Sequence, residues 1–236
     1  MINYDLLLNE AEKIGIELGQ YGADRFDTYA ERLVRWNEHV NLTAITDPDD
    51  IVIKHFIDSL YAMKYVYFKS GQSVADVGTG AGFPGMPLLI ANPELEVNFI
   101  DSSGKRINFI KDVLSNMGII ASSTHERAED VGKNPEFREK YDFATARAVA
   151  PLNVLCEYCL PLVKVGGRFV SLKGSNGMEE LEAARNAIKV LGGELETAES
   201  YELPNGDGRT IFVIKKISQT PTKYPRKPKK IDTRPL

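Results

Sequence analysis

The segment of the chain best suited to chemistry is a glycine-rich loop with one acidic residue just ahead of it. It reads VADVGTGAGFPG over residues 74–85. Glycines permit tight turns and let a ligand approach the backbone more closely than a Cβ would allow. A short apolar stretch, 73–77, precedes the loop and a helical stretch follows it. We therefore expect the loop at the carboxyl edge of a parallel sheet, where such folds bind ligands.

The spacing of the glycines narrows the choice of ligand. A dinucleotide loop of the form G-x-G-x-x-G requires glycine where this chain has Phe83, and no G-x-x-x-x-G-K-[ST] phosphate loop occurs. The observed D-x-G-x-G-x-G, with Asp76 on the strand, suits S-adenosylmethionine, whose sulfonium and amino groups are cationic. We predict that Gly78 and Gly80 contact this methyl donor. A dinucleotide site and a turn-rich loop without a ligand are the alternatives.

Three later segments supply further candidate contacts. Asp101 ends the next predicted strand, where its carboxylate can accept hydrogen bonds from both hydroxyls of a ribose. After the third strand, the backbone N–H near Ala128 and the Glu129 carboxylate match the acceptor N1 and the donor N6 of adenine. Arg147 follows the fourth strand, where it could pair with a cofactor carboxylate or a substrate phosphate or carbonyl. An unengaged Asp101 and a solvated acidic helix start at 128–130 are the alternatives.

The elements that must position these residues alternate along the middle of the chain. Strands are predicted over 73–77, 97–101, 119–124, 142–146 and 168–172. Helices are predicted over 84–91, 104–117, 151–163 and 179–191. This alternation predicts an α/β fold with a Rossmann-like, mostly parallel sheet. Two further strands, 194–202 and 210–216, flank Asn205-Gly206-Asp207-Gly208, which predicts a terminal antiparallel hairpin.

Helical segments precede this sheet and a basic tail follows it. Apolar side chains recur at steps of three and four over 24–42, and Asp47-Pro48 caps a second helix over 51–63. Residues 218–236 contain four prolines and many charges, and we expect them to be flexible until a partner binds. The predicted organisation has three parts: a helical N-terminal subdomain (1–70), a sheet domain (71–217) and the tail (218–236).

Composition and charge limit the class of protein. The 236 residues are 43% hydrophobic and 26% charged, as is ordinary for a globular chain. No apolar run approaches the ~18 residues of a membrane span, no secretory signal is evident, and two cysteines make no disulfide framework, so a cytoplasmic protein is expected. Residues 215–236 carry eight basic side chains and one acidic, a net +7, which leaves −11 for residues 1–214. The basic end can reach an anionic polymer or simply aid solubility.

Several residues that suggest sites are interpreted as structural. His55 lies among apolar neighbours on a helix and is predicted to be packed and hydrogen-bonded. Trp36 is predicted to anchor the N-terminal helices. Cys156 and Cys159 are predicted to fill the core, because zinc would need two more ligands. No metal site is predicted.

Six blocks of sequence together resemble the RsmG family, also called glucose-inhibited division protein B. They occur in order over nearly the whole chain: RWNEHVNLTAI (35–45), HFIDSL (55–60), VADVGTGAGFPG (74–85), RAED (127–130), ARAVAPL (146–152) and GGRFVSLKG (166–174). The resemblance implies a class I methyltransferase that moves a methyl group from S-adenosylmethionine to N7 of a guanine in the 530 loop of bacterial 16S ribosomal RNA, leaving S-adenosylhomocysteine. It also implies cofactor contacts from Gly78, Phe83, Ala128, Glu129 and Arg147.

The implied reaction makes modest demands on the protein. Guanine N7 has an in-plane lone pair and no proton to remove, so alignment of the reactants is the main requirement. We therefore assign no catalytic acid or base. We expect 16S RNA or a small-subunit particle as partner, no DNA or membrane, and a monomer. The principal alternative is a non-catalytic RNA-binding ribosome-assembly factor on the same fold. A nicotinamide enzyme is disfavoured by Phe83 and the terminal hairpin.

Overall fold

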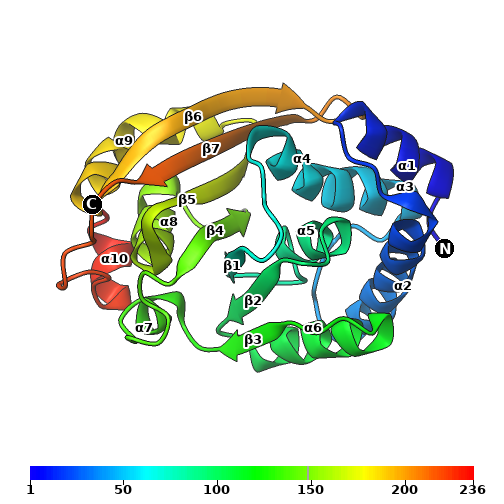
Figure 1. Cartoon of the computed structure of the whole chain (residues 1–236), viewed down its shortest axis with the longest axis horizontal. Helices are drawn as coiled ribbons and strands as arrows, with labels where there is room; N and C mark the ends of the chain where they lie inside the picture. The colour runs from blue at the N-terminus through cyan, green and yellow to red at the C-terminus, as the bar shows by residue number, and fades with distance from the viewer. Residues whose placement is uncertain (148) are drawn as a thin grey trace.

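A seven-stranded sheet forms the middle of the molecule (Figure 1), as seen in a computed structural model that describes residues 1–147 and 149–236. The strand order is β3-β2-β1-β4-β5-β7-β6. Strands β1 to β5 are parallel, and β7 is antiparallel to both β5 and β6. The strands are β1 (Ser73–Val77), β2 (Glu96–Asp101), β3 (Ser122–His125), β4 (Tyr141–Arg147), β5 (Val163–Gly174), β6 (Gly193–Glu202) and β7 (Gly208–Lys216). The predicted α/β class and terminal hairpin are confirmed.

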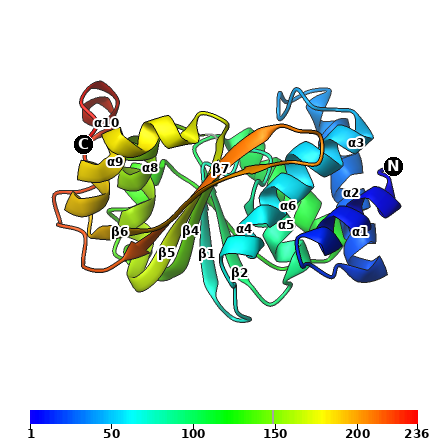
Figure 2. The ribbon, with the colours of Figure 1, turned by 90° about the horizontal axis from the view of Figure 1, so that it is seen from above.

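Helices cover both faces of this sheet (Figure 2). One face is covered by the N-terminal helices together with two helices of the alternating region: α1 (Tyr4–Lys13), α2 (Gly19–Asn37), α3 (Pro48–Ile51), the π-helix η1 (Val52–Ile57), α4 (Asp58–Tyr65), α5 (Gly85–Ala91) and α6 (Gly104–Met117). The other face is covered by α8 (Leu152–Cys159), the 3₁₀-helix η2 (Leu160–Leu162) and α9 (Gly177–Val190). The short helix α7 (Ala128–Val131) and the C-terminal α10 (Pro228–Thr233) pack against α8. Successive strand residues face opposite layers. Thus Val74 packs with the N-terminal helices and Ala75 with α8 and α9. None of the helices in the described ranges is long and apolar enough to cross a membrane.

The N-terminal helices share one hydrophobic core with the sheet. Tyr29 of α2, Phe56 of η1 and Phe109 of α6 are fully buried in the same cluster as Val74. The Tyr29 hydroxyl also donates a hydrogen bond to the carbonyl oxygen of Ala81 in the glycine loop. Burying each such aromatic side chain contributes roughly 2–3 kcal/mol. The N-terminal helices therefore pack against the glycine loop and fix its position relative to the sheet.

Most predicted elements are confirmed, and the differences have local causes. Strand β1 and helix α6 have the predicted bounds, and Asp47 caps α3 by accepting the backbone N–H groups of residues 49 and 50. The helix predicted over 24–42 runs from Gly19 to Asn37 instead. It ends there because the Asn37 side chain accepts hydrogen bonds from the backbone N–H groups of Leu42 and Thr43, which turns the chain away.

The expectation that residues 218–236 are flexible is wrong. The segment folds against α7 and α8 and ends in α10 (Figure 1), with Tyr224 and Ile231 buried. Glu157 of α8, itself fully buried, accepts hydrogen bonds from the backbone N–H and the guanidinium of Arg226, at 2.7 Å and 2.6 Å. The tail's composition is typical of disorder, but its few apolar and charged anchors have specific partners on the body.

Candidate functional site

A cavity of about 500 Å³ lies at the carboxyl ends of β1, β2 and β4. Strand order changes direction at β1, with β2 on one side and β4 on the other, and such a switch point is where open α/β sheets bind ligands. The volume is within the range of small-molecule sites. The wall includes all seven residues selected from the sequence: Gly78, Gly80, Phe83, Asp101, Ala128, Glu129 and Arg147. Whether they contact a cofactor stays a prediction.

Asp76 shapes the glycine loop and does not line the cavity. Its carboxylate is fully buried and accepts hydrogen bonds from the hydroxyls of Thr79 and Thr145 and from the backbone N–H of Gly85. Burial raises the pKa of Asp76 to about 6, against the lowering effect of these hydrogen bonds. The sequence reasoning that Asp76 suits a cationic ligand is therefore not supported by the geometry, because the carboxylate is engaged within the loop.

At two glycines of the loop, a side chain would meet both a strained backbone conformation and a neighbouring residue. Gly78 has φ +65°, and a Cβ there would lie 2.8 Å from the side chain of Val149. Gly82 has φ +99°, and a Cβ there would lie 2.8 Å from the Tyr29 hydroxyl. Both φ angles are in the region that L-residues rarely adopt. The loop consequently presents bare backbone to the cavity on one side and packs closely on α2 on the other.

Two buried carboxylates in the wall provide hydrogen-bond acceptors. Asp101 and Glu129 are each 3% exposed, yet both line the cavity. Asp101 accepts the backbone N–H groups of Gly80 at 2.9 Å and Ser103 at 2.8 Å. A carboxylate has about four acceptor positions, so Asp101 retains capacity toward the cavity. Glu129 has a single side-chain contact, with Arg127 at 3.5 Å. A ligand with hydroxyl and amine donors, such as a nucleoside, suits these acceptors.

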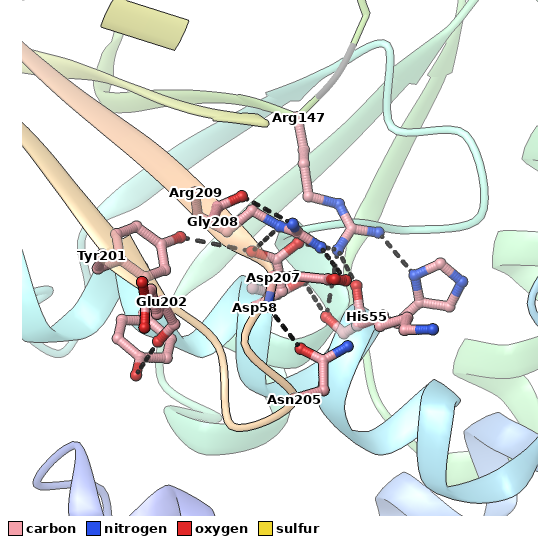
Figure 3. Close-up of polar contacts among 12 residues, drawn as sticks. His55, Asp58, Arg147, Tyr201, Glu202, Asn205, Asp207, Gly208 and Arg209 are labelled. Atoms are coloured by element: carbon pink, nitrogen blue, oxygen red, sulfur yellow. Dashed lines mark hydrogen bonds and ion pairs between the residues drawn. The ribbon is translucent and has the colours of Figure 1, made fainter. Parts of the chain in front are cut away.

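Arg147 is held by a network that reaches the N-terminal helices (Figure 3). Its Nη1 donates to the carbonyl oxygens of Lys54 at 3.1 Å and His55 at 3.3 Å, and pairs with the Asp58 carboxylate at 3.1 Å. The carbonyl groups belong to η1, a π-helical turn inside the helix predicted over 51–63. Such turns are rare and often occur at functional sites. This turn places two carbonyl groups where they bind the guanidinium.

Asp58 joins Arg147 to the C-terminal hairpin. Its other oxygen lies 3.3 Å from the guanidinium of Arg209 and 3.4 Å from the hydroxyl of Tyr201, which donates to it (Figure 3). Asp58 is only 4% exposed. The sequence analysis missed both Asp58 and Arg209. A signal was present for Asp58, because a carboxylate inside an apolar helical stretch must be paired when it is buried. No local pattern indicates its partner 151 residues later.

Phe83 contacts a neutral and a charged planar group, which also contact each other. Its ring stacks on the imidazole of His55 with centroids 4.4 Å apart, and the Arg147 guanidinium lies 4.4 Å from its centroid. Arg147 has only donors, so His55 Nδ1 accepts its hydrogen bond at 3.1 Å. His55 Nε2 therefore carries the proton and donates to the Thr43 hydroxyl at 2.8 Å. The prediction of a packed, hydrogen-bonded His55 is confirmed, and the residue also lines the cavity.

The buried, neutral state of His55 makes the stability of the folded protein sensitive to acid. Burial and the nearby Arg147 lower its pKa to about 3, below the ordinary 6.5. The unfolded chain binds a proton on this residue near pH 6.5 and the folded chain does not, so its contribution to stability is full above pH 6.5 and is lost as the pH falls. Between pH 7 and pH 4 the loss is about 3 kcal/mol.

Urea unfolding at the two pH values, for the unchanged protein and His55→Gln, measures this loss. We expect the stability difference between the two proteins to shrink by about that amount at pH 4. A difference that does not change with pH contradicts a neutral, buried His55.

The other residues singled out in the sequence have structural partners. Trp36 donates from its indole N–H to Asp112 at 2.8 Å, and Cys156 and Cys159 are fully buried, as predicted. Over 1–147 and 149–236 no group of three or more metal-binding side chains occurs. Two cations of β5 are also paired, Arg168 with Glu196 and Lys173 with Glu180.

Solved structures similar to this one share its fold at low sequence identity. TrmN from Thermus thermophilus matches with a TM-score of 0.54 and 19% identity, over 70% of this chain and 53% of that one. The [4+2]-cyclase SpnF matches with a TM-score of 0.55 and 14% identity, over 82% and 94%. A geranyl diphosphate methyltransferase in complex with SAM has a TM-score of 0.53 and 12% identity, over 67% and 84%. Because these names include a cyclase, the fold alone does not fix the chemistry.

Sequence comparisons are more specific. The family model described as rRNA small subunit methyltransferase G matches residues 23–206. The protein named ribosomal RNA small subunit methyltransferase G of Lactobacillus delbrueckii subsp. bulgaricus is 46% identical over the full length of both chains. The protein of the same name from Bacillus licheniformis is 49% identical over 92% of each chain. The family match includes every segment that lines the cavity, and the chain therefore belongs to the rRNA small subunit methyltransferase G family.

Proposed function

We propose that this protein transfers a methyl group from S-adenosylmethionine to N7 of a guanine in the 530 loop of 16S ribosomal RNA. The observation that carries the proposal is the cavity beside the glycine loop, whose wall brings together the seven residues that the sequence selected from four separate segments. The names of the relatives support a ribosomal RNA of the small subunit as substrate. The atom and the loop are the finer part of the proposal and derive from the resemblance of the six sequence blocks.

The residues of the wall match the parts of the proposed cofactor. Gly78 and Gly80 present backbone without a Cβ, so a ligand can lie directly on the loop. Asp101 is assigned to the ribose hydroxyls, and the Ala128 N–H with the Glu129 carboxylate to the adenine edge. Phe83 and Arg147 form the part of the wall next to η1, where both contact His55. When bound, S-adenosylmethionine supplies an activated methyl group on its sulfonium.

The hydrogen bonds of His55 and Arg147 favour a nucleophile that needs no deprotonation, because neither side chain is available as a base. His55 is a histidine of the cavity wall, and both of its ring nitrogens are engaged. Arg147 is a donor only and is held by Asp58. Guanine N7 has no proton to lose, so the task of the protein is to orient the two reactants at contact distance, which can lower a barrier by several kcal/mol. The carboxylates of Asp101 and Glu129 favour the cationic donor electrostatically.

Methyl transfer to small-subunit RNA tests the proposal. The protein is incubated with isotope-labelled S-adenosylmethionine and either a 16S transcript or small subunits from cells that lack this activity. The RNA is then digested and mapped by mass spectrometry. We expect one labelled methyl group, on one guanine of the 530 loop, as 7-methylguanosine. Stable binding of the RNA without any methyl transfer would favour the ribosome-assembly factor, and a methyl group at another atom would contradict the N7 assignment.

A further inference from the structure

A second opening lies beside the cofactor cavity, between α10 and the residues that follow α7. It has a volume of about 660 Å³. Seven of the nine residues that line it are basic and none is acidic: Lys133, Lys223, Arg226, Lys227, Lys229, Lys230 and Arg234. We call this opening the basic groove. It stands out because the first 214 residues of the chain carry a net charge of −11.

The tail that forms most of the basic groove is held in place by contacts to its backbone. Arg138 donates to the carbonyl oxygens of Gly132 and Tyr224 at 2.8 Å each and of Thr220 at 2.7 Å. The tail also lies so close to α7 that a Cβ on Gly132 would be 3.0 Å from the ring of Pro225. These contacts use the backbone of the tail and leave its lysine side chains free to bind a ligand.

The charges of the basic groove are not neutralised by the protein. Over the described residues, Arg226 is the member of the groove found in an ion pair, with Glu157. The other six side chains belong to exposed residues, and none of them is in an ion pair within the described ranges. Clustered, unpaired cations repel one another and cost stability. A polyanion is the class of ligand that relieves this repulsion.

Residues of α7 and α8 that line the cavity are close in sequence to residues that line or hold the basic groove. Ala128 and Glu129 at the start of α7 line the cavity, and Lys133, just after the helix, lines the groove. In α8, Tyr158 lines the cavity, while the preceding residue, Glu157, holds Arg226. Figure 1 shows α7, α8 and α10 together at the end of the molecule away from α1 and α2. A strand of nucleic acid with one base in the cavity can therefore place its backbone along the groove.

We propose that the basic groove binds the phosphate backbone of the substrate RNA next to the nucleotide that is methylated. This inference rests on the proposed function and adds where the RNA lies. RNA fits better than an acidic protein surface, because the groove offers a row of flexible cations around α10 without apolar side chains exposed among them. Binding of this kind depends on salt, since each neutralised phosphate releases counterions.

The test compares two triple variants with the same change in net charge. The first is Lys227→Gln, Lys229→Gln and Lys230→Gln in the groove. The control is Lys69→Gln, Lys111→Gln and Lys189→Gln, three exposed lysines that are in no ion pair over the described residues and lie outside the groove. Affinity for a 16S transcript is measured from 0.1 M to 1 M salt. Calorimetry with S-adenosylhomocysteine shows whether each variant keeps an intact cavity.

We expect the groove variant to reduce the slope of log K against log salt by about two, because three contacts contribute about 0.7 each on single-stranded RNA. That change corresponds to about a hundredfold weaker binding at 0.1 M salt. The control should retain the slope and affinity of the unchanged protein apart from a small general effect, and both variants should bind S-adenosylhomocysteine as before.

Equal slopes and affinities for the two triple variants would overturn the assignment of the groove, and methylation by the unchanged protein would show that the proposed function survives. If the groove variant binds the transcript with normal affinity but binds assembled small subunits more weakly, the groove contacts a ribosomal protein. The assignment of the groove to RNA is then also overturned. Failure of the unchanged protein to methylate either substrate counts against the proposed function itself.

Discussion

Asp58→Ala should lower the free energy of unfolding by about 3–5 kcal/mol, because it leaves two guanidinium groups without their shared carboxylate. Asp58 lies 3.1 Å from Arg147 and 3.3 Å from Arg209, and the pairs are largely buried, with the arginine side chains 12% and 19% exposed. Removing one partner of a buried ion pair costs far more than the pair contributes as a whole, since an uncompensated charge remains. Urea unfolding at pH 7 measures the loss.

Asp207→Ala is the matched control for this variant. Asp207 also pairs with Arg209, but at 3.6 Å and with a side chain that is 45% exposed. Exposed pairs contribute about 1 kcal/mol or less, so the control should remain close to the unchanged protein. Asp58→Asn keeps the shape of the side chain and should lose stability in the same direction as Asp58→Ala. Equal stabilities of Asp58→Ala and Asp207→Ala would mean that the network of Figure 3 does not hold the hairpin to α4.

Gly78→Asp should abolish measurable binding of S-adenosylmethionine. A Cβ at this position meets Val149 at 2.8 Å, and the added carboxylate enters a cavity that already contains Asp101 and Glu129. An unpaired charge buried under a ligand costs about 3–5 kcal/mol, which weakens binding by a hundredfold or more. Isothermal titration calorimetry of the folded variant measures the effect.

Gly118→Asp separates the effect on the cavity from backbone strain. Gly118 ends α6 with φ +63°, close to the +65° of Gly78, and a Cβ there meets nothing within 4 Å. The strain of a left-handed residue, about 1–2 kcal/mol, is therefore similar in both variants. Gly118→Asp should bind the cofactor as the unchanged protein does. Normal binding by Gly78→Asp would remove the glycine loop from the cofactor site.

Local sequence patterns predict the sheet well because they report on neighbouring residues. The β-branched run 73–77 and the periodic stretch 104–117 become β1 and α6 with the predicted bounds. The π-helical turn at Val52–Ile57 has no such pattern, since its apolar residues suit an ordinary helix equally well. The fold of the tail, residues 218–236, was likewise not predicted, because no local pattern indicates it. Its order depends on Glu157 and Arg138, far away in the sequence, and not on its own composition.

The candidate site likewise has one set of residues that the sequence predicts and another that it does not. The residues of the wall follow strand ends, and the topology of a parallel sheet brings strand ends to one edge. The sequence therefore selected Gly78, Asp101 and Arg147 without knowledge of the structure, and all three line one cavity. The residues that hold Arg147 in place come from η1, α4 and the hairpin, and no spacing along the chain relates them. Only the three-dimensional structure reveals such support.

The most direct test of the central claim is a crystal structure of the protein grown with S-adenosylhomocysteine, the product form of the proposed cofactor. The account predicts density for the ligand in the cavity beside residues 78–83, with its ribose at Asp101 and its adenine at Ala128 and Glu129. Density for the ligand at another place on the protein, or a cavity that stays without ligand at saturating concentration, would contradict it.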